Sequence, residues 1–248
     1  MVYFIGAGPG DVDLITVKGR QTLESADVVI YAGSLVSNEH LKFCKGSAKI
    51  YNSAKMTLDE VIEVMKENRD KIIVRLHTGD PAIYGAIKEQ MDELDKLNIE
   101  YKVIPGVSSF TAAASSIKKE FTLPSVTQTV ILTRVEGRTP VPEGEDLEKL
   151  ASIGASMAIF LSISMIDKVV KKLRNGYGRN VNIAVVERAT WEDERIILGT
   201  LDDISEKVKE AGITKCAQIL VGDFINCDYE KSKLYDKSFT HMFRDAKE

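Results

Sequence analysis

The sequence has few of the residues that build metal centres and disulfide frameworks. Its 248 residues include only three cysteines and three histidines. Cys44, Cys216 and Cys227 are far apart and show no CxxC spacing, which indicates reduced thiols in a cytoplasmic protein. The histidines fit no metal-ligand spacing, so we expect no metal site built by the chain.

Long apolar runs and an excess of positive charge are missing as well. No run approaches the roughly 20 residues of a membrane-spanning helix, and the first residues resemble a core strand rather than a signal peptide. The formal net charge is -4, which argues against a broad nucleic-acid-binding face. With 44% hydrophobic and 28% charged residues, the chain can form one large domain or two small ones, and we expect neither a membrane nor a nucleic acid as partner.

Strand and helix patterns alternate through the first half of the chain. Strand patterns, most of them running into a turn, stand at 2–8, 27–33, 48–52, 71–80 and 100–106. They alternate with helical patterns, one of which begins with a capping box at Thr57 and Glu60. A short helix is expected at 35–44. This alternation predicts right-handed βαβ units and a parallel sheet.

The second half repeats the pattern after an interruption. Strands are expected at 129–134, 157–163, 182–190, 195–200 and 217–225, with a helix near 201–213 that Thr200 and Asp203 cap. The residues from about Asn226 are predicted to form a frayed tail. The predicted fold class is α/β with two α/β lobes: an N-terminal lobe over 1–117, a linker over 118–128 and a C-terminal lobe over 129–248.

The stretch GAGPGD at 6–11 follows the first strand and does not match the common nucleotide motifs. Its third glycine comes one place too early for a Rossmann fingerprint, and the next strand ends without a carboxylate. A P-loop would need Lys and Ser or Thr after the last glycine. Pro9 lacks an N–H donor, which suits a phosphate poorly. From the glycines alone, a tight turn without a ligand and a ligand-binding loop both remain open.

Three more turns rich in small residues stand at expected strand ends, at 31–36, 77–85 and 105–109. Parallel α/β sheets bind ligands at the carboxyl ends of their strands, often between lobes. Four such turns in one lobe favour a shared ligand. One carboxylate, Asp80, and few donors suit a nucleoside with a positive centre better than a polyphosphate.

Several of these stretches together resemble one family. GAGPGDVDLITVKG, ADVVIYAGSLV, HTGDPAIYGA, VIPGVSSFTAAAS and VTQTVILTRVEGRTPVP, in that order, are similar to the tetrapyrrole methylases that use S-adenosylmethionine. The similarity continues through ATWEDERIILGTL and AQILVG. YAGSLV together with TQTVILTRVEGRTP resembles the branch that methylates carbon 11 of precorrin-4 or cobalt-precorrin-4 in cobalamin biosynthesis. The resemblance implies a two-lobe α/β homodimer with S-adenosylmethionine bound in an active-site cleft between the lobes.

The resemblance also implies the residues that contact ligands. The expected cofactor-binding residues are Pro9, Thr78, Gly79, Asp80, Ile83, Ser108 and Ser109 in the first lobe, and Leu161, Ala189 and Ala217 in the second. The expected substrate-binding residues are Asp11, Ser34, Arg134 and Arg138. Relatives often carry Asp where this chain has Gly33, so no carboxylate is expected to act as a base there.

The expected chemistry needs no nucleophile and no metal ligand from the chain, and no catalytic residue is assigned. The sulfonium methyl group is already activated, so the protein mainly aligns the reactants and excludes water. The macrocycle carries carboxylates, which favours Arg134 and Arg138 as contacts, although a solvated loop would explain them equally well. Two alternatives remain open: a methylase of the same fold with another target position or substrate, and a nonenzymatic nucleotide-binding module.

Overall fold

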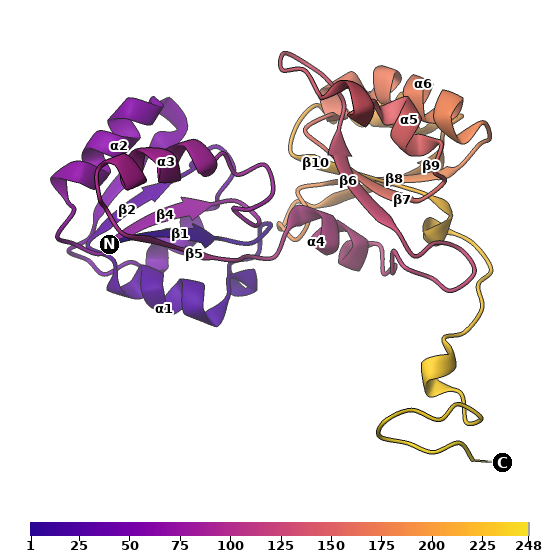
Figure 1. Cartoon of the computed structure of the whole chain (residues 1–248). Helices are drawn as coiled ribbons and strands as arrows, with labels where there is room; N and C mark the ends of the chain where they lie inside the picture. Colours follow the sequence, from indigo (N-terminus) through magenta and orange to yellow (C-terminus); the bar gives the residue numbers. More distant parts are fainter. Residues whose placement is uncertain (248) are drawn as a thin grey trace. The chain divides into compact units, whose positions relative to one another are not determined.

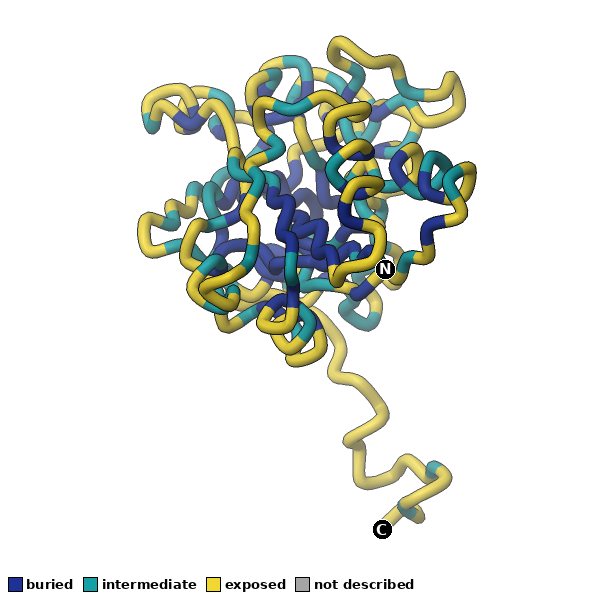
Figure 2. The backbone as a smooth tube through the Cα atoms, turned by 90° about the vertical axis from the view of Figure 1, so that its left-hand side faces the viewer, coloured by how far each residue is buried: buried dark blue, intermediate teal, exposed yellow. Residues whose placement is uncertain are grey.

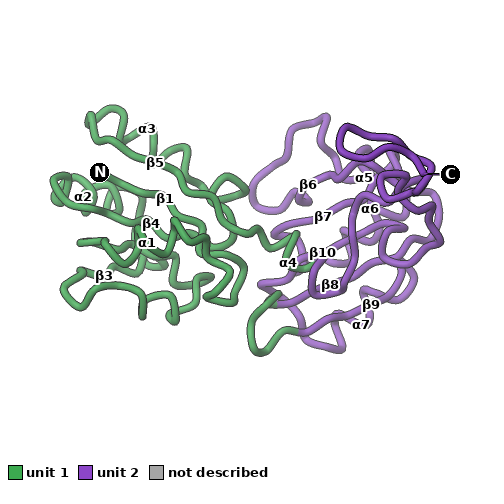
Figure 3. Tube along the Cα trace, turned by 90° about the horizontal axis from the view of Figure 1, so that it is seen from below, with its two compact units in different colours: residues 1–113, 188–194 green, residues 114–187, 195–248 purple. Residues whose placement is uncertain are grey.

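A computed structural model describes residues 1–247 as two compact units, each built around one five-stranded sheet (Figures 1 and 3). Unit 1 comprises residues 1–113 and 188–194, and unit 2 comprises 114–187 together with the chain from 195 onward. The short segment 188–194 therefore groups with unit 1, although it joins two strands of unit 2. The linker boundaries at 118 and 128 stay a prediction; this stretch contains no helix or strand.

The sheet of unit 1 is entirely parallel, as the alternating pattern predicts. Its strands follow the order β3-β2-β4-β1-β5. They span β1 (Val2–Gly6), β2 (Val28–Tyr31), β3 (Lys49–Asn52), β4 (Ile73–His77) and β5 (Tyr101–Ile104). Because the strands are parallel, all their carboxyl ends lie at one edge of the sheet.

Helices cover both faces of this sheet (Figure 1). They are α1 (Val17–Ser25), α2 (Leu58–Glu67) and α3 (Lys88–Lys96). A further helix, α4 (Ser109–Ser116), follows β5. One apolar cluster joins the sheet to α2 and α3, and a second lies on the face of α1. Figure 2 shows these buried stretches in dark blue. The predicted capping box of α2 is present, with Thr57 and Glu60 exchanging hydrogen bonds.

The sheet of unit 2 is mixed and has the order β6-β7-β10-β8-β9. Only β6 and β7 run parallel, while the other three pairs are antiparallel. The strands are β6 (Val130–Arg134), β7 (Ser156–Phe160), β8 (Asn182–Glu187), β9 (Arg195–Thr200) and β10 (Ala217–Val221). The helices α5 (Leu147–Ala151), α6 (Ile166–Tyr177) and α7 (Ile204–Glu210) pack on one large apolar cluster.

Several predicted boundaries are wrong for local reasons. β7 ends at Phe160 and β8 at Glu187, because Leu161 and Arg188 have φ values of 53° and 50°, which no strand accommodates. The expected helix at 35–44 is a 3-10 segment, Asn38–Phe43. Asp203, rather than Thr200, is the N-cap of α7, and its carboxylate accepts from the Thr200 N–H.

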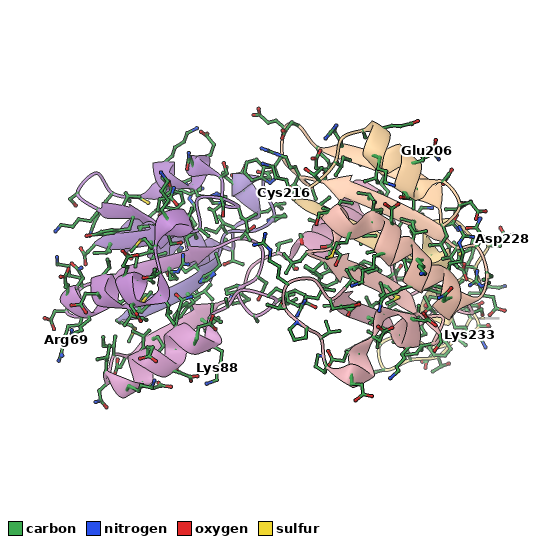
Figure 4. All side chains as sticks on the ribbon, turned by 90° about the horizontal axis from the view of Figure 1, so that it is seen from above. Arg69, Lys88, Glu206, Cys216, Asp228 and Lys233 are labelled. Atoms are coloured by element: carbon green, nitrogen blue, oxygen red, sulfur yellow. The ribbon has the colours of Figure 1, made fainter. Side chains whose placement is uncertain are left out.

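Residues 227–247 are largely exposed and contain one 3-10 turn, Lys233–Tyr235. Over the described 1–247, no helix is both long and apolar enough to cross a membrane. All three cysteines are free thiols, and Cys216 is exposed just before β10 (Figure 4).

Candidate active site

Three of the predicted loops meet at the carboxyl edge of the unit 1 sheet. They follow the neighbouring strands β4, β1 and β5 and comprise residues 78–80, 6–11 and 105–109. The Gly79 N–H donates to the Gly8 carbonyl over 2.8 Å, and the Gly8 N–H donates back to the Gly79 carbonyl over 3.3 Å. We call these three loops the edge loops.

The glycines of the edge loops are required by the close approach of backbone to backbone. A Cβ atom on Gly6 or on Gly106 would collide with the Gly79 carbonyl oxygen. A larger residue at either position would push two loops apart. Gly6, the first glycine of GAGPGD, is therefore required because the protein's own backbone lies close to it.

Asp80 ties two edge loops together through its carboxylate. One oxygen accepts from the Ala82 N–H over 2.8 Å, and the other accepts from the Gly106 N–H over 2.9 Å. The carboxylate thus closes its own turn and fixes the loop after β5. This position at the strand end suits a residue that orients a ligand through the shape of the loops.

The segment 188–194 packs against the loop 6–11. The Trp191 Nε1–H donates to the Pro9 carbonyl over 2.9 Å, and the Asp11 N–H donates to Thr190 Oγ1 over 3.0 Å. The Asp11 carboxylate accepts from the Asp13 N–H over 2.9 Å. Sequence reasoning did not anticipate the roles of Thr190 and Trp191; the single tryptophan in ATWEDE was the available signal.

A buried histidine also reaches the glycine-rich loop. His40 Nε2 lies 2.9 Å from the Ala7 carbonyl oxygen, and its Nδ1 lies 3.1 Å from the Ser37 carbonyl oxygen. The side chain is 1% exposed. The 3-10 segment after β2 thus contacts the glycine-rich loop through His40. The sequence pattern did not indicate this contact.

The remaining predicted residues of unit 1 lie close to these loops in sequence and fold. Thr78 and Ile83 are half-buried, Ser108 is buried, and Ser109 is the first residue of α4. Ala189 is buried in the segment 188–194 and therefore belongs to unit 1. Ser34 is exposed in the loop after β2, where Asn52 fills the space that a Cβ on Gly33 would take.

Arg134, Arg138 and Leu161 line one cavity of about 360 Å³ in unit 2. Arg134 donates to the Thr139 carbonyl over 3.1 Å and to the Pro140 carbonyl over 2.6 Å, so it holds the loop that follows β6. Arg138 is exposed on this loop and forms no ion pair with any residue of 1–247. Ala217 does not line this cavity; it starts β10 and packs against the core of unit 2.

An ion-pair cluster fastens the same loop to α6. The Glu136 carboxylate lies 2.8 Å from Lys168 Nζ and 3.1 Å from Lys172 Nζ, and Lys172 also pairs with Asp146. Hydrogen bonding to Lys168 lowers the pKa of Glu136 to about 2. Glu136 is therefore ionised at neutral pH, and its ion pairs hold the loop that carries Arg138 against α6.

Below the edge loops, β4 carries two buried basic side chains. His77 is 4% exposed and its Nε2 has no partner among the described residues. Burial, together with the nearby charge of Arg75, lowers the pKa of His77 to about 3. Arg75 donates to Gln90 Oε1 and to the Ile30 carbonyl, and its burial lowers its pKa to about 10. His77 is therefore neutral at pH 7, and both side chains are buried.

Comparison with known proteins identifies the family. The model of the tetrapyrrole (corrin/porphyrin) methylases matches residues 1–205. The chain is 58% identical to a cobalt-precorrin-4 C(11)-methyltransferase of Methanocaldococcus jannaschii, over 98% of this chain and 95% of that protein. The chain belongs to the tetrapyrrole methylase family.

Two solved structures of tetrapyrrole methylases are similar to this chain. The X-ray structure of a cobalt precorrin-4 methyltransferase, a cobalamin biosynthetic enzyme, matches with a TM-score of 0.88 and 46% identity, covering 91% of this chain and 96% of that one. A uroporphyrin-III C-methyltransferase of Thermus thermophilus, complexed with S-adenosylhomocysteine, matches with a TM-score of 0.76 and 24% identity, covering 90% and 98%. The second likeness shows the tetrapyrrole methylase fold alone.

Proposed function

We propose that this tetrapyrrole methylase transfers the methyl group of S-adenosylmethionine to carbon 11 of cobalt-precorrin-4 in cobalamin biosynthesis. The observation that carries the proposal is the 58% identity to a cobalt-precorrin-4 C(11)-methyltransferase over nearly the whole length of both chains. The 46% identity to the cobalt precorrin-4 methyltransferase of known structure agrees with the cobalt-containing substrate.

The edge loops fit the methyl donor. The stretches 6–14, 78–87 and 105–109 contain no lysine or arginine, while they carry the carboxylates of Asp11, Asp13 and Asp80. A sulfonium cation is compatible with such surroundings, whereas a polyphosphate needs basic side chains or free N–H groups. The residues proposed to bind the donor from unit 1 are Pro9, Thr78, Gly79, Asp80, Ile83, Ser108, Ser109 and Ala189.

The cavity of unit 2 fits a ligand with carboxylate groups. Arg138 presents an exposed guanidinium group there, and Arg134 holds the loop that carries it. A guanidinium group pairs with a carboxylate through two parallel hydrogen bonds. We assign Arg138 to direct contact with the tetrapyrrole. Asp11, Ser34 and Arg134 remain proposed substrate residues, and Leu161 and Ala217 remain proposed donor residues.

The chain contributes positioning to the reaction. S-adenosylmethionine, when bound, supplies an already activated methyl group. The edge loops hold a fixed shape through backbone hydrogen bonds and the Asp80 carboxylate, which lowers the entropic part of the barrier by orienting the donor. Fixed backbone dipoles at these loops stabilise charge without reorganising.

We also propose that the protein is a homodimer in the cytoplasm. We infer a homodimer, because Ile196 and Leu198 of β9 expose apolar side chains at the edge of the unit 2 sheet, at 39% and 55%. The three free thiols are compatible with a cytoplasmic location.

Calorimetric titration tests the assignment of the methyl donor. S-adenosylmethionine and its demethylated product are expected to bind with one site per chain, and NAD is expected not to bind. Tight binding of NAD, with no heat from either sulfur compound, would contradict the proposal.

A further inference from the structure

The segment 188–194 (RATWEDE) is the only part of the later half of the described chain that groups with unit 1. It connects β8 to β9, yet it makes two hydrogen bonds to the loop 6–11. Trp191 donates to the Pro9 carbonyl, and Thr190 accepts from the Asp11 N–H. These two contacts fix the peptide groups on both sides of Gly10.

Gly10 and Trp191 form a matched pair. A Cβ atom on Gly10 would overlap the indole ring, so the ring lies directly on the backbone of the loop. An indole group combines a large rigid surface with a single N–H donor, and here both are used on the same loop. The last glycine of GAGPGD is thus explained by Trp191, which lies 182 positions from Pro9.

The segment holds Trp191 in one orientation. The Arg188 guanidinium lies 4.2 Å from the centre of the indole ring and pairs with Asp193 over 2.8 Å. The Thr190 N–H donates to the Glu194 carboxylate over 2.7 Å. Arg188 and Thr190 have φ values of 50° and 69°. Strained backbone of this kind persists where its surroundings hold it, and it gathers at ligand clamps.

We propose that Trp191 is a positioning residue for the methyl donor. It holds the Pro9 carbonyl and the backbone of Gly10, and through them it keeps the loop 6–11 in the shape that binds S-adenosylmethionine. Thr190 supports it by fixing the peptide of Asp11. The inference rests on the proposed function, because it takes the donor to bind at the edge loops.

Two variants separate the ring from its N–H group. Trp191→Phe keeps an aromatic ring on Gly10 and loses the hydrogen bond to Pro9, so the Kd for S-adenosylhomocysteine should rise about 5-fold, in line with the loss of one hydrogen bond. Trp191→Ala removes both and should raise this Kd at least 30-fold. The turnover rate at saturating donor should change little in both.

The chain offers matched controls in the same segment. Glu192 is exposed next to Trp191, and Glu192→Ala should leave the Kd for S-adenosylhomocysteine unchanged. Thr190→Val removes the acceptor for the Asp11 N–H and should weaken binding, while Thr190→Ser keeps the hydroxyl and should restore it. A role in stability alone would lower the melting temperature of these variants and leave the Kd as it is.

Intrinsic fluorescence gives a second readout that needs no variant, because Trp191 is the only tryptophan of the chain. S-adenosylhomocysteine should change the emission intensity or wavelength of the wild-type protein with the same Kd that calorimetry gives. If Trp191→Ala fails to fold, this titration and Trp191→Phe decide the matter.

A failure of this inference and a failure of the proposed function give different results. Binding to the wild-type protein, combined with an unchanged Kd in Trp191→Phe and unchanged emission, would overturn the role of Trp191. No binding of S-adenosylhomocysteine to the wild-type protein would instead overturn the proposed function.

Discussion

At the scale of single residues, Asp80 shows how a motif acts through its contacts. The sequence predicts one carboxylate at the mouth of a site. The structure shows that both its oxygens accept backbone N–H groups, from Ala82 and from Gly106. The role that we propose for Asp80 towards the donor is therefore to hold two loops together, and a change in donor binding is expected to come with a change in stability.

Asp80→Ala leaves two N–H groups without their acceptor. We expect the free energy of unfolding to fall by about 1–3 kcal/mol, and the Kd for S-adenosylmethionine to rise far more than turnover at saturating donor falls. Asp80→Asn, which keeps one acceptor oxygen, should give an intermediate Kd. Calorimetry and denaturant unfolding measure both quantities. A collapse of turnover with unchanged donor binding would instead make Asp80 a group that transfers a proton.

The lowered pKa of His77 predicts how the stability of the protein depends on pH. Its pKa is about 3 in the folded protein and 6.5 in an ordinary environment, so the unfolded chain binds the proton first as the pH falls. Stability is therefore lost below about pH 6.5, and the loss continues towards pH 3. Between pH 7 and pH 5 the free energy of unfolding should fall by at most about 2 kcal/mol through this group.

The variant His77→Phe tests this assignment, because His77 Nε2 has no partner to lose within residues 1–247. Denaturant unfolding at pH 7 and pH 5 should show a smaller loss of stability in the variant than in the wild-type protein. An equal loss in both proteins would mean that other groups cause the pH dependence.

At the scale of elements, the order of the strands could be predicted from the sequence, and so could the gathering of the loops after β1, β4 and β5. The alternation of apolar and helical patterns dictates both. The helices α4 and α5 are not among the predicted elements. The direction of the strands in unit 2 could not be predicted, because a buried apolar strand can have the same sequence pattern whether its neighbour is parallel or antiparallel. The contact of Trp191 with Pro9 could not be predicted either, since no local pattern encodes a partner so distant in the sequence.

The loop after β6 yields a prediction that separates two arginines. Arg138→Ala should raise the KM for the tetrapyrrole up to about 5-fold, which corresponds to one partly exposed ion pair. Arg134→Ala should raise it as well, because the loop loses two hydrogen bonds to its carbonyl groups. Donor affinity should stay unchanged in both variants.

Conservative replacements distinguish contact from support in this loop. Arg138→Lys should restore part of the affinity for the tetrapyrrole, and added salt should weaken substrate binding less in Arg138→Ala than in the wild-type protein. If neither alanine variant changes the KM, both arginines belong to a solvated surface.

At the scale of the whole molecule, two units of different sheet topology form one chain with a net charge of -4. The exposed apolar residues of β9 suggest that this edge is covered by a second copy. Sedimentation at micromolar concentration should show a dimer, and Leu198→Lys should shift it towards the monomer. A monomeric wild-type protein under these conditions would count against the homodimer.

The position and the source of the transferred methyl group test the central claim most directly. The protein is incubated with cobalt-precorrin-4 and S-adenosylmethionine that carries a ¹³C methyl group, and the product is analysed by NMR. We predict a single labelled methyl group on carbon 11 of the macrocycle. A label on any other ring carbon, or methylation of metal-free precorrin-4 with none of the cobalt compound, would contradict the proposed function.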